Sequence, residues 1–249
     1  MIHLIVGRQG SGKTLVLVKE AYKYYRQKKN IYSNVHLTFK SKRSPNNPKF
    51  KIKSRNQFRL AHPIYKKFSM KKIEHDEGLY HAFLSDYNEY ADKLKDLFFK
   101  EFGYYKLYLD DIIDCKLKNG LVILDEIHLY LSARYSMSKT SRMMCDSFLS
   151  MVRKKGLVVM GTTQTERKVD VRFREEKDYF WIINKYAYVK GHWSNVMHNQ
   201  NLDPKIPLMI KCEIEETFQG STIETSFLGN SYFKYYDTKQ IINIEGLDA

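Results

Sequence analysis

Residues 7–14 read Gly-Arg-Gln-Gly-Ser-Gly-Lys-Thr and match the phosphate-loop pattern G-x-x-x-x-G-K-[ST] at every fixed position. The apolar run Ile2–Val6 before the loop predicts a buried strand, and residues 13–29 after it have the apolar spacing of a helix. Glycines let backbone N–H groups curve around phosphates, and the helix N-terminus adds its dipole. We therefore expect the whole loop to bind a nucleotide, through Gly7, Arg8, Gln9, Gly10, Ser11, Gly12, Lys13 and Thr14.

A second motif, Leu-Val-Ile-Leu-Asp-Glu at residues 121–126, supplies the acidic groups that such a loop needs. Its apolar residues predict a central strand buried on both faces. At the end of this strand we expect Asp125 to meet Mg²⁺ together with the Thr14 hydroxyl, and Glu126 to polarise the attacking water. With Lys13 on the β- and γ-phosphates, the two motifs indicate Mg²⁺-dependent ATP hydrolysis. A glutamate at this position favours hydrolysis over transfer of the phosphoryl group to a small acceptor, and so argues against a nucleoside kinase.

Two further groups of residues are candidates for the reaction. Thr162-Thr163-Gln164 follows the apolar run 157–161, where a γ-phosphate sensor would lie between the two motifs, and we expect Gln164 to be that sensor. An ordinary polar turn is the alternative. We interpret His128, two residues past Glu126, as structural rather than catalytic.

A guanidinium that stabilises the transition state would complete the site. Our first candidate is Arg153, supplied in trans by a neighbouring subunit, because it lies at the end of a predicted helix. Arg134 is the second candidate and could act in cis. Arg172 and Arg174 come third, and for each of the four a solvated surface position is the alternative.

The remaining pattern predicts an α/β protein with a mostly parallel central sheet flanked by helices. Further strands are expected at residues 31–35, 120–124, 157–161 and 179–183, helices at 73–102 and 139–155, and edge strands within 207–245. Residues 107–113 fit either a helix or a short strand. We expect one domain over 1–249, with its core at about 1–37 and 105–249. A basic and helical insertion at about 38–104 would begin as loop with short strands.

Composition favours a polyanionic partner. Among 249 residues, Lys and Arg number 42 and Asp and Glu 28, so the formal net charge is 42 − 28 = +14. Solubility alone is the alternative explanation. The excursion 38–72 is dense in Lys and Arg with Phe50 and Phe58 between them, and we expect it to contact a DNA backbone. An exposed charged loop is the alternative.

Cysteine content and hydropathy indicate a cytoplasmic protein. The chain has three cysteines without metal-ligand or paired spacing, which fits a reducing compartment and three small core side chains. No signal peptide and no apolar stretch long enough to span a membrane is evident. We therefore expect no stable membrane insertion.

The order of the motifs resembles the FtsK/HerA-like superfamily of DNA-pumping ATPases. It is most similar to the genome-packaging ATPases of tailless double-stranded DNA viruses, with zonula occludens toxin-like phage ATPases as near relatives. The resemblance covers about 1–35 and 120–185 and is carried by GRQGSGKT (7–14), IYSN (31–34), LDEIHLYLSAR (124–134), MVRKKG (151–156), TTQ (162–164), VDVRFR (169–174) and YYDT (235–238). Only the phosphate loop among these is highly specific.

The resemblance implies a RecA-like P-loop core, a ring of five or six subunits, a trans arginine finger and DNA threaded through the centre. We therefore expect an ATP-driven double-stranded DNA translocase that packages a viral genome with a capsid or portal-vertex protein. It would work in the host cytoplasm, and association with the virion is a further expectation. Two alternatives stay open: an ATPase driving filament assembly or secretion, and a nucleotide-switched interaction module that barely hydrolyses ATP.

Overall fold

The computed structural model describes residues 1–41, 58, 61–67, 76–108, 111–112, 116–132, 139–196 and 205–236. The strands are β1 (Ile2–Val6), β2 (Asn30–Ser33), β3 (Tyr105–Lys106), β4 (Gly120–Leu124), β5 (Leu157–Thr163), β6 (Tyr179–Val189), β7 (His192–Asn195), β8 (Leu208–Glu216) and β9 (Thr222–Leu228). The α-helices are α1 (Lys13–Arg26), α3 (Pro63–Lys67), α5 (Glu77–Phe102), α7 (Lys139–Lys154) and α8 (Val171–Glu175). Short 3₁₀ turns are η2 (Ile127–Leu129), η4 (Glu166–Lys168) and η5 (Gly229–Tyr235).

The nine strands of the described residues form one sheet in the order β3-β2-β4-β5-β1-β6-β8-β9, with β7 paired to β6. The strands from β3 to β6 in this order are parallel, and β7, β8 and β9 are antiparallel. Strand β5 lies between β1 and β4, with Val6 opposite Thr163 and Leu124 opposite Gly161. The predicted mostly parallel α/β sheet is confirmed, and the carboxyl ends of these three strands meet at one edge.

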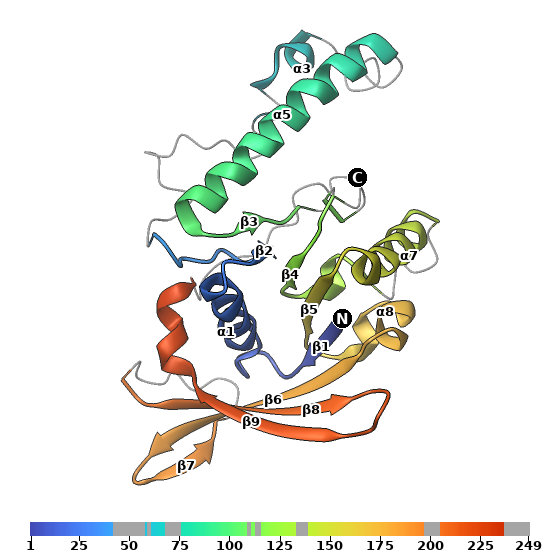
Figure 1. Ribbon diagram of the computed structural model, residues 1–249. Helices are drawn as coiled ribbons and strands as arrows, with labels where there is room; N and C mark the ends of the chain where they lie inside the picture. The colour runs from blue at the N-terminus through green and yellow to red at the C-terminus, as the bar shows by residue number, and fades with distance from the viewer. Residues whose placement is uncertain are drawn as a thin grey trace.

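Helices cover both faces of the sheet and bury a core on each (Figure 1). On one face, α1 packs with the C-terminal part of α5 and with η5 over Ile5, Ile31 and Ile123. On the other face, α7 and α8 cover Leu4 and Val122. Strand β4 is buried along its whole length, as its continuous apolar run predicts.

Several element boundaries differ from the sequence predictions. Helix α1 ends at Arg26, so Lys28 and Lys29 lie beyond it rather than in its last turn; Lys28 has a φ of 56°, which a helix does not allow. Strand β5 includes Thr162 and Thr163, so only Gln164 of the polar triplet follows it. Strand β6 is also longer than predicted, and the short strand β7 after it was not predicted.

Helices α3 and α5 lie outside the sheet, and α5 extends far from it (Figure 1). Asp76 caps the start of α5 by accepting a hydrogen bond from the Leu79 amide, and Gly103 ends the helix with a φ of 89°. The predicted helix at 73–102 is confirmed in type. The described part of residues 38–72 contains the helix α3 rather than the expected short strands.

Side chains of the basic excursion, Lys40 and Phe58 among them, make contacts within the protein. The Lys40 ammonium donates to the carbonyl oxygen of Phe99 at 3.1 Å, at the end of α5. Phe58 stacks on Tyr90 with a ring separation of 4.2 Å, so this aromatic ring packs on α5 rather than standing free for a nucleic acid. Most other basic residues of the excursion, and Phe50, lie outside the described residues.

The structure also describes part of residues 107–113, two of the cysteines and the hydropathy of the helices. In the stretch 107–113, Asp111 and Ile112 are helical, and a short strand ends just before it at Lys106. Cys145 and Cys212 are buried free thiols, as expected for core side chains, and Cys115 lies outside the described residues. Among the helices that the structure describes, none is long and apolar enough to cross a membrane.

Candidate nucleotide site

The loop between β1 and α1 holds its lysine in place through backbone carbonyl groups. Gly10 and Gly12 have φ values of 74° and 98°, which favour glycine at both positions. The Lys13 ammonium donates to the carbonyl oxygens of Gly7 at 2.8 Å and Arg8 at 3.1 Å, and the side chain is buried. Burial lowers the pKa of the ammonium, while the nearby carboxylates raise it. The loop therefore presents a poorly solvated cation that a phosphate could reach.

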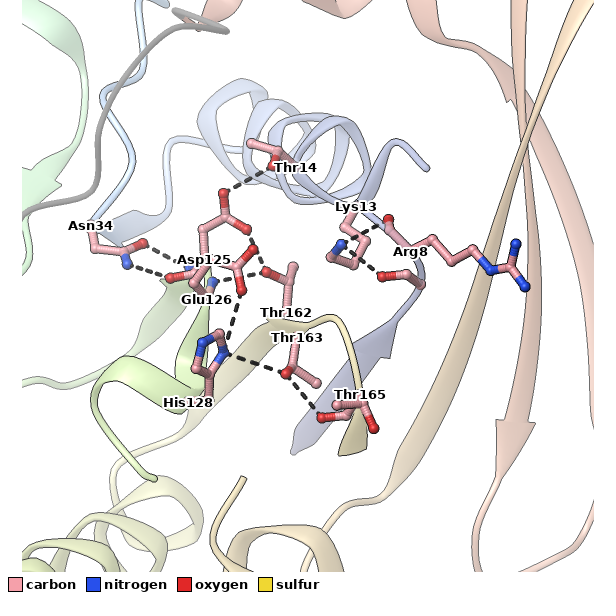
Figure 2. Close-up of polar contacts among 11 residues, drawn as sticks. Arg8, Lys13, Thr14, Asn34, Asp125, Glu126, His128, Thr162, Thr163 and Thr165 are labelled. Atoms are coloured by element: carbon pink, nitrogen blue, oxygen red, sulfur yellow. Dashed lines mark hydrogen bonds and ion pairs between the residues drawn. The ribbon is translucent and has the colours of Figure 1, made fainter. Parts of the chain in front are cut away.

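Asp125 at the end of β4 joins the loop to two strands of the sheet (Figure 2). Its Oδ2 accepts a hydrogen bond from the Thr14 hydroxyl at 2.9 Å. Its Oδ1 accepts one from the Thr162 hydroxyl of β5. The side chain is buried, so these two hydroxyl groups satisfy a carboxylate that water hardly reaches. The sheet edge thus fixes the acid predicted to meet Mg²⁺.

Glu126 has a left-handed backbone conformation with a φ of 54°. For a residue with a side chain this conformation costs about 1–3 kcal/mol, and here the Glu126 amide donates to the Thr162 hydroxyl oxygen at 3.0 Å. Burial and Asp125 raise the pKa of the Glu126 carboxyl, whereas Lys13, Lys168 and a hydrogen bond with Gln164 lower it. The held conformation and the raised proton affinity are features of a general base.

His128 contacts Glu126 directly. Its Nδ1 lies 3.3 Å from Glu126 Oε2 and 3.5 Å from the Thr163 hydroxyl. Burial lowers the pKa of the imidazole, and Lys168 and Lys13 lower it further, so the ring is neutral near pH 7. A neutral ring in this position can orient the Glu126 carboxylate, which agrees with the structural role expected from the sequence.

Asn34, directly after β2, is a site residue that reasoning from residue chemistry missed. Its Nδ2 donates to the main-chain oxygen of Asp125 at 2.8 Å, and its Oδ1 accepts from the Asp125 amide at 2.9 Å. The pair of bonds holds the backbone where β4 ends (Figure 2). The sequence signal was an asparagine near the end of the predicted strand 31–35, within the stretch IYSN at 31–34.

Thr14 and Asp125 offer oxygen ligands that suit Mg²⁺. A hydroxyl and a carboxylate are hard oxygen ligands, and Mg²⁺ is commonly held by one or two such groups together with substrate phosphates and water. Among the described residues, no group of three His, Cys, Asp or Glu could hold a metal ion without such help. The residues present therefore fit a Mg²⁺ that arrives with a nucleotide.

The other predicted residues lie at different distances from this cluster. Gln164 follows β5 beside the site and hydrogen-bonds with Glu126, although it is exposed to solvent. Arg153 lies just before the start of β5, at the amino-terminal ends of the parallel strands, whereas the loop is at their carboxyl ends. Its guanidinium forms an ion pair with Glu176 at 2.9 Å. It cannot reach the site of its own chain. Arg134 lies outside the described residues.

The third pair of arginine candidates belongs to α8. Arg172 donates to both carboxylate oxygens of Asp170, at 2.9 and 2.8 Å, and also contacts Asp146. This bidentate pairing fixes Arg172 in its own subunit and gives it a structural role. The Arg174 Nε is buried without a hydrogen-bond partner in the described part of the chain.

These features define a nucleotide-binding P-loop protein with a RecA-like fold. The class rests on the complete phosphate loop, on the acidic pair at the end of β4, and on the placement of β5 between the two motif strands. No family model and no curated protein matches the chain.

Several solved structures are similar to this chain. One is the N-terminal domain of zonular occludens toxin from Neisseria meningitidis, with 14% identity, a TM-score of 0.46, and coverage of 95% of this chain and 98% of that chain. Another is the genome packaging NTPase B204 from Sulfolobus turreted icosahedral virus 2 in complex with AMP, with 11% identity, a TM-score of 0.43, and coverage of 90% of this chain and 95% of that chain. A third is the flagellar accessory protein FlaH from Methanocaldococcus jannaschii, with 11% identity, a TM-score of 0.46, and coverage of 91% of this chain and 84% of that chain.

Proposed function

We propose that this protein hydrolyses ATP and uses the energy to translocate double-stranded DNA, as the packaging motor of a viral genome. The observation that carries the hydrolytic part is the convergence of four side chains at one sheet edge: Lys13, Thr14, Asp125 and Glu126. They come from the loop and from a strand that is not its neighbour, so the sheet order brings them together.

In the proposed reaction, Lys13 exchanges the carbonyl oxygens of Gly7 and Arg8 for the β- and γ-phosphates. Glu126 accepts a proton from the water that attacks the γ-phosphorus, and Gln164 orients that water or the phosphate. Thr14 and Asp125 would hold Mg²⁺, which neutralises charge on the phosphates when it is bound. Water supplies the oxygen of the new P–O bond, and ADP leaves.

The DNA part of the proposal rests on charge and on the motif order. A formal net charge of +14 favours a polyanionic partner. We propose that the basic excursion at 38–72 contacts the duplex backbone and that the subunits form a ring of five or six. A capsid or portal-vertex protein would then be the docking partner, in a host cytoplasm or virion.

A triplex-displacement assay tests translocation. A third DNA strand is bound to one end of a duplex, and a protein that moves along the duplex releases it in an ATP-dependent manner. We expect release by the unmodified protein and none by Glu126→Gln.

Two other results would favour the alternative functions. Hydrolysis that responds only to single-stranded DNA or to a protein would indicate extrusion or secretion. ATP binding without measurable turnover would indicate a nucleotide-switched module.

A further inference from the structure

A cavity of about 500 Å³ adjoins the phosphate loop on the side away from the acidic cluster. Its walls are the loop itself, with Arg8 and Gln9, and the strands β6 and β7, with Lys185 and Asn195. Strand β6 pairs with β1 only as far as Ile182 and then continues beside the loop. The second half of β6, beyond the predicted strand 179–183, therefore builds one wall of this cavity.

Lys185 lies on the face of β6 that is turned to the loop. It lies two residues beyond Ile183, which is buried on the same face of the strand, and it is paired in register with Ile210 of β8. A Cβ placed on Gly12 would come within 2.5 Å of Ile210 Cδ1, so this part of the strand pair touches the loop. The Lys185 side chain thus lies beside the residues that curve around phosphate.

The Lys185 ammonium has no hydrogen bond or ion pair among the described residues. The lysine is only partly exposed, and burial lowers the pKa of its ammonium, with no carboxylate among the described residues to oppose the effect. A desolvated cation without a counter-ion is unfavourable unless an anion completes it. This cavity therefore has an unsatisfied preference for an anionic group.

The strand order tells which part of a nucleotide would lie there. Strand β1 has β5 and β4 on one side and β6 on the other. Asp125 and Glu126 are on the β4 side, so a triphosphate in reacting position directs its γ-phosphate toward them. Its α-phosphate and nucleoside then point to the β6 side, toward the cavity.

We propose that Lys185 binds the α-phosphate of the nucleotide from the same subunit, and that the adjoining cavity holds the nucleoside. This inference rests on the proposed function only in requiring that the loop binds ATP. It does not require hydrolysis or DNA. Lys185 would then be a substrate-binding residue that complements Lys13, one cation on each side of the β-phosphate.

The test measures dissociation constants of ATP and ADP for Lys185→Met, Lys185→Arg and Lys211→Met. Lys211 is the matched control, because it lies on the neighbouring strand β8 between the buried Ile210 and Cys212 and does not line the cavity. Its ammonium forms an ion pair with Glu224, with an N–O distance of 2.9 Å. Lys185→Met should weaken ATP and ADP by the same factor, on the order of tenfold, because both carry the α-phosphate. Lys185→Arg should recover most of the affinity, and Lys211→Met should change little.

Three results would overturn the proposal. Unchanged affinities in Lys185→Met would show that the lysine makes no contact. Weakening of ATP alone would assign the contact to the γ-phosphate, and equal weakening in Lys211→Met would reduce the effect to general charge. A thermal melt of each variant without nucleotide separates misfolding from loss of contact, and Lys185→Gln, which also removes the charge, repeats the affinity measurement if the methionine variant is unstable. Turnover is measured separately, so a protein that binds ATP but fails to hydrolyse it would refute the proposed function and not this contact.

Discussion

Lys13 and Glu126 differ in what they touch, and this difference separates binding from hydrolysis. Lys13 lies in the loop, whereas Glu126 lies at the end of β4 beside Asp125. Lys13→Ala should weaken ATP binding and abolish turnover. Glu126→Gln has nearly the same shape and should keep ATP binding while lowering turnover by a factor on the order of 10² or more. Equilibrium binding and steady-state turnover of both variants check this, and near-normal turnover in Glu126→Gln would remove Glu126 from the mechanism.

The environment of Glu126 also predicts a pH-dependent stability. Burial and Asp125 raise the pKa of Glu126 above its ordinary value of 4.5, so the folded protein holds that proton more tightly than the unfolded chain. The ionised carboxylate therefore destabilises the fold above the raised pKa, and the penalty disappears as the pH falls below 4.5. Glu126→Gln should melt at a higher temperature than the unmodified protein at pH 7, with a smaller difference toward pH 4.5. A lower melting temperature for Glu126→Gln at pH 7 would contradict this account.

Asn34 acts on the site through the main chain of Asp125. Asn34→Ala leaves a buried amide and a carbonyl without their partners, which should lower the free energy of unfolding by about 1–3 kcal/mol. Because the end of β4 then loosens, kcat should fall more than ATP affinity does. Denaturant unfolding and steady-state kinetics measure the two effects. A loss of stability with unchanged kcat would make Asn34 purely structural.

At the scale of elements, the sequence predicted best those segments whose pattern is set locally. Strand β4 is a continuous apolar run buried on both faces, and the loop before α1 is fixed by its glycines. The length of strand β6 was underestimated because apolar and polar residues alternate irregularly in its second half. This half is stabilised by pairing with β7, which is polar, and with β8, which is distant in sequence. The bond between Asn34 and Asp125 depends on β2 lying beside β4, and no local pattern encodes that neighbour.

Helix α7 carries the arginine that we expect to act across a subunit boundary. Arg153 is at the sheet edge opposite its own loop, so a catalytic role requires a second copy. Its ion pair with Glu176 is exposed and should contribute little to stability. Arg153→Ala should lower turnover by about 10³–10⁵, the effect of arginine fingers.

Mixing two inactive variants tests the trans role of Arg153. Lys13→Ala subunits retain Arg153, and Arg153→Ala subunits retain an intact loop. Mixed assemblies should regain part of the turnover that neither variant shows alone. No recovery from assemblies shown to be mixed, or full activity of Arg153→Ala alone, would exclude this arginine as the finger.

At the scale of the whole molecule, the nucleotide site and Arg153 lie at opposite ends of the parallel strands, as the head-to-tail assembly that we propose requires. The nucleotide site is at the carboxyl edge of the parallel strands, and Arg153 is near the opposite edge. A ring closes when one surface of each copy meets a different surface of the next copy. The expected ring therefore needs two distinct surfaces, and the single sheet provides them.

Steady-state ATP hydrolysis with and without duplex DNA tests the central claim most directly, using Glu126→Gln as the blank. The account predicts Mg²⁺-dependent turnover that duplex DNA stimulates strongly and that Glu126→Gln lacks in both conditions. Single-stranded DNA of equal length is the control for non-specific binding to a basic protein, and it should stimulate less. Turnover that duplex DNA leaves unchanged, or turnover that persists in Glu126→Gln, would contradict the account.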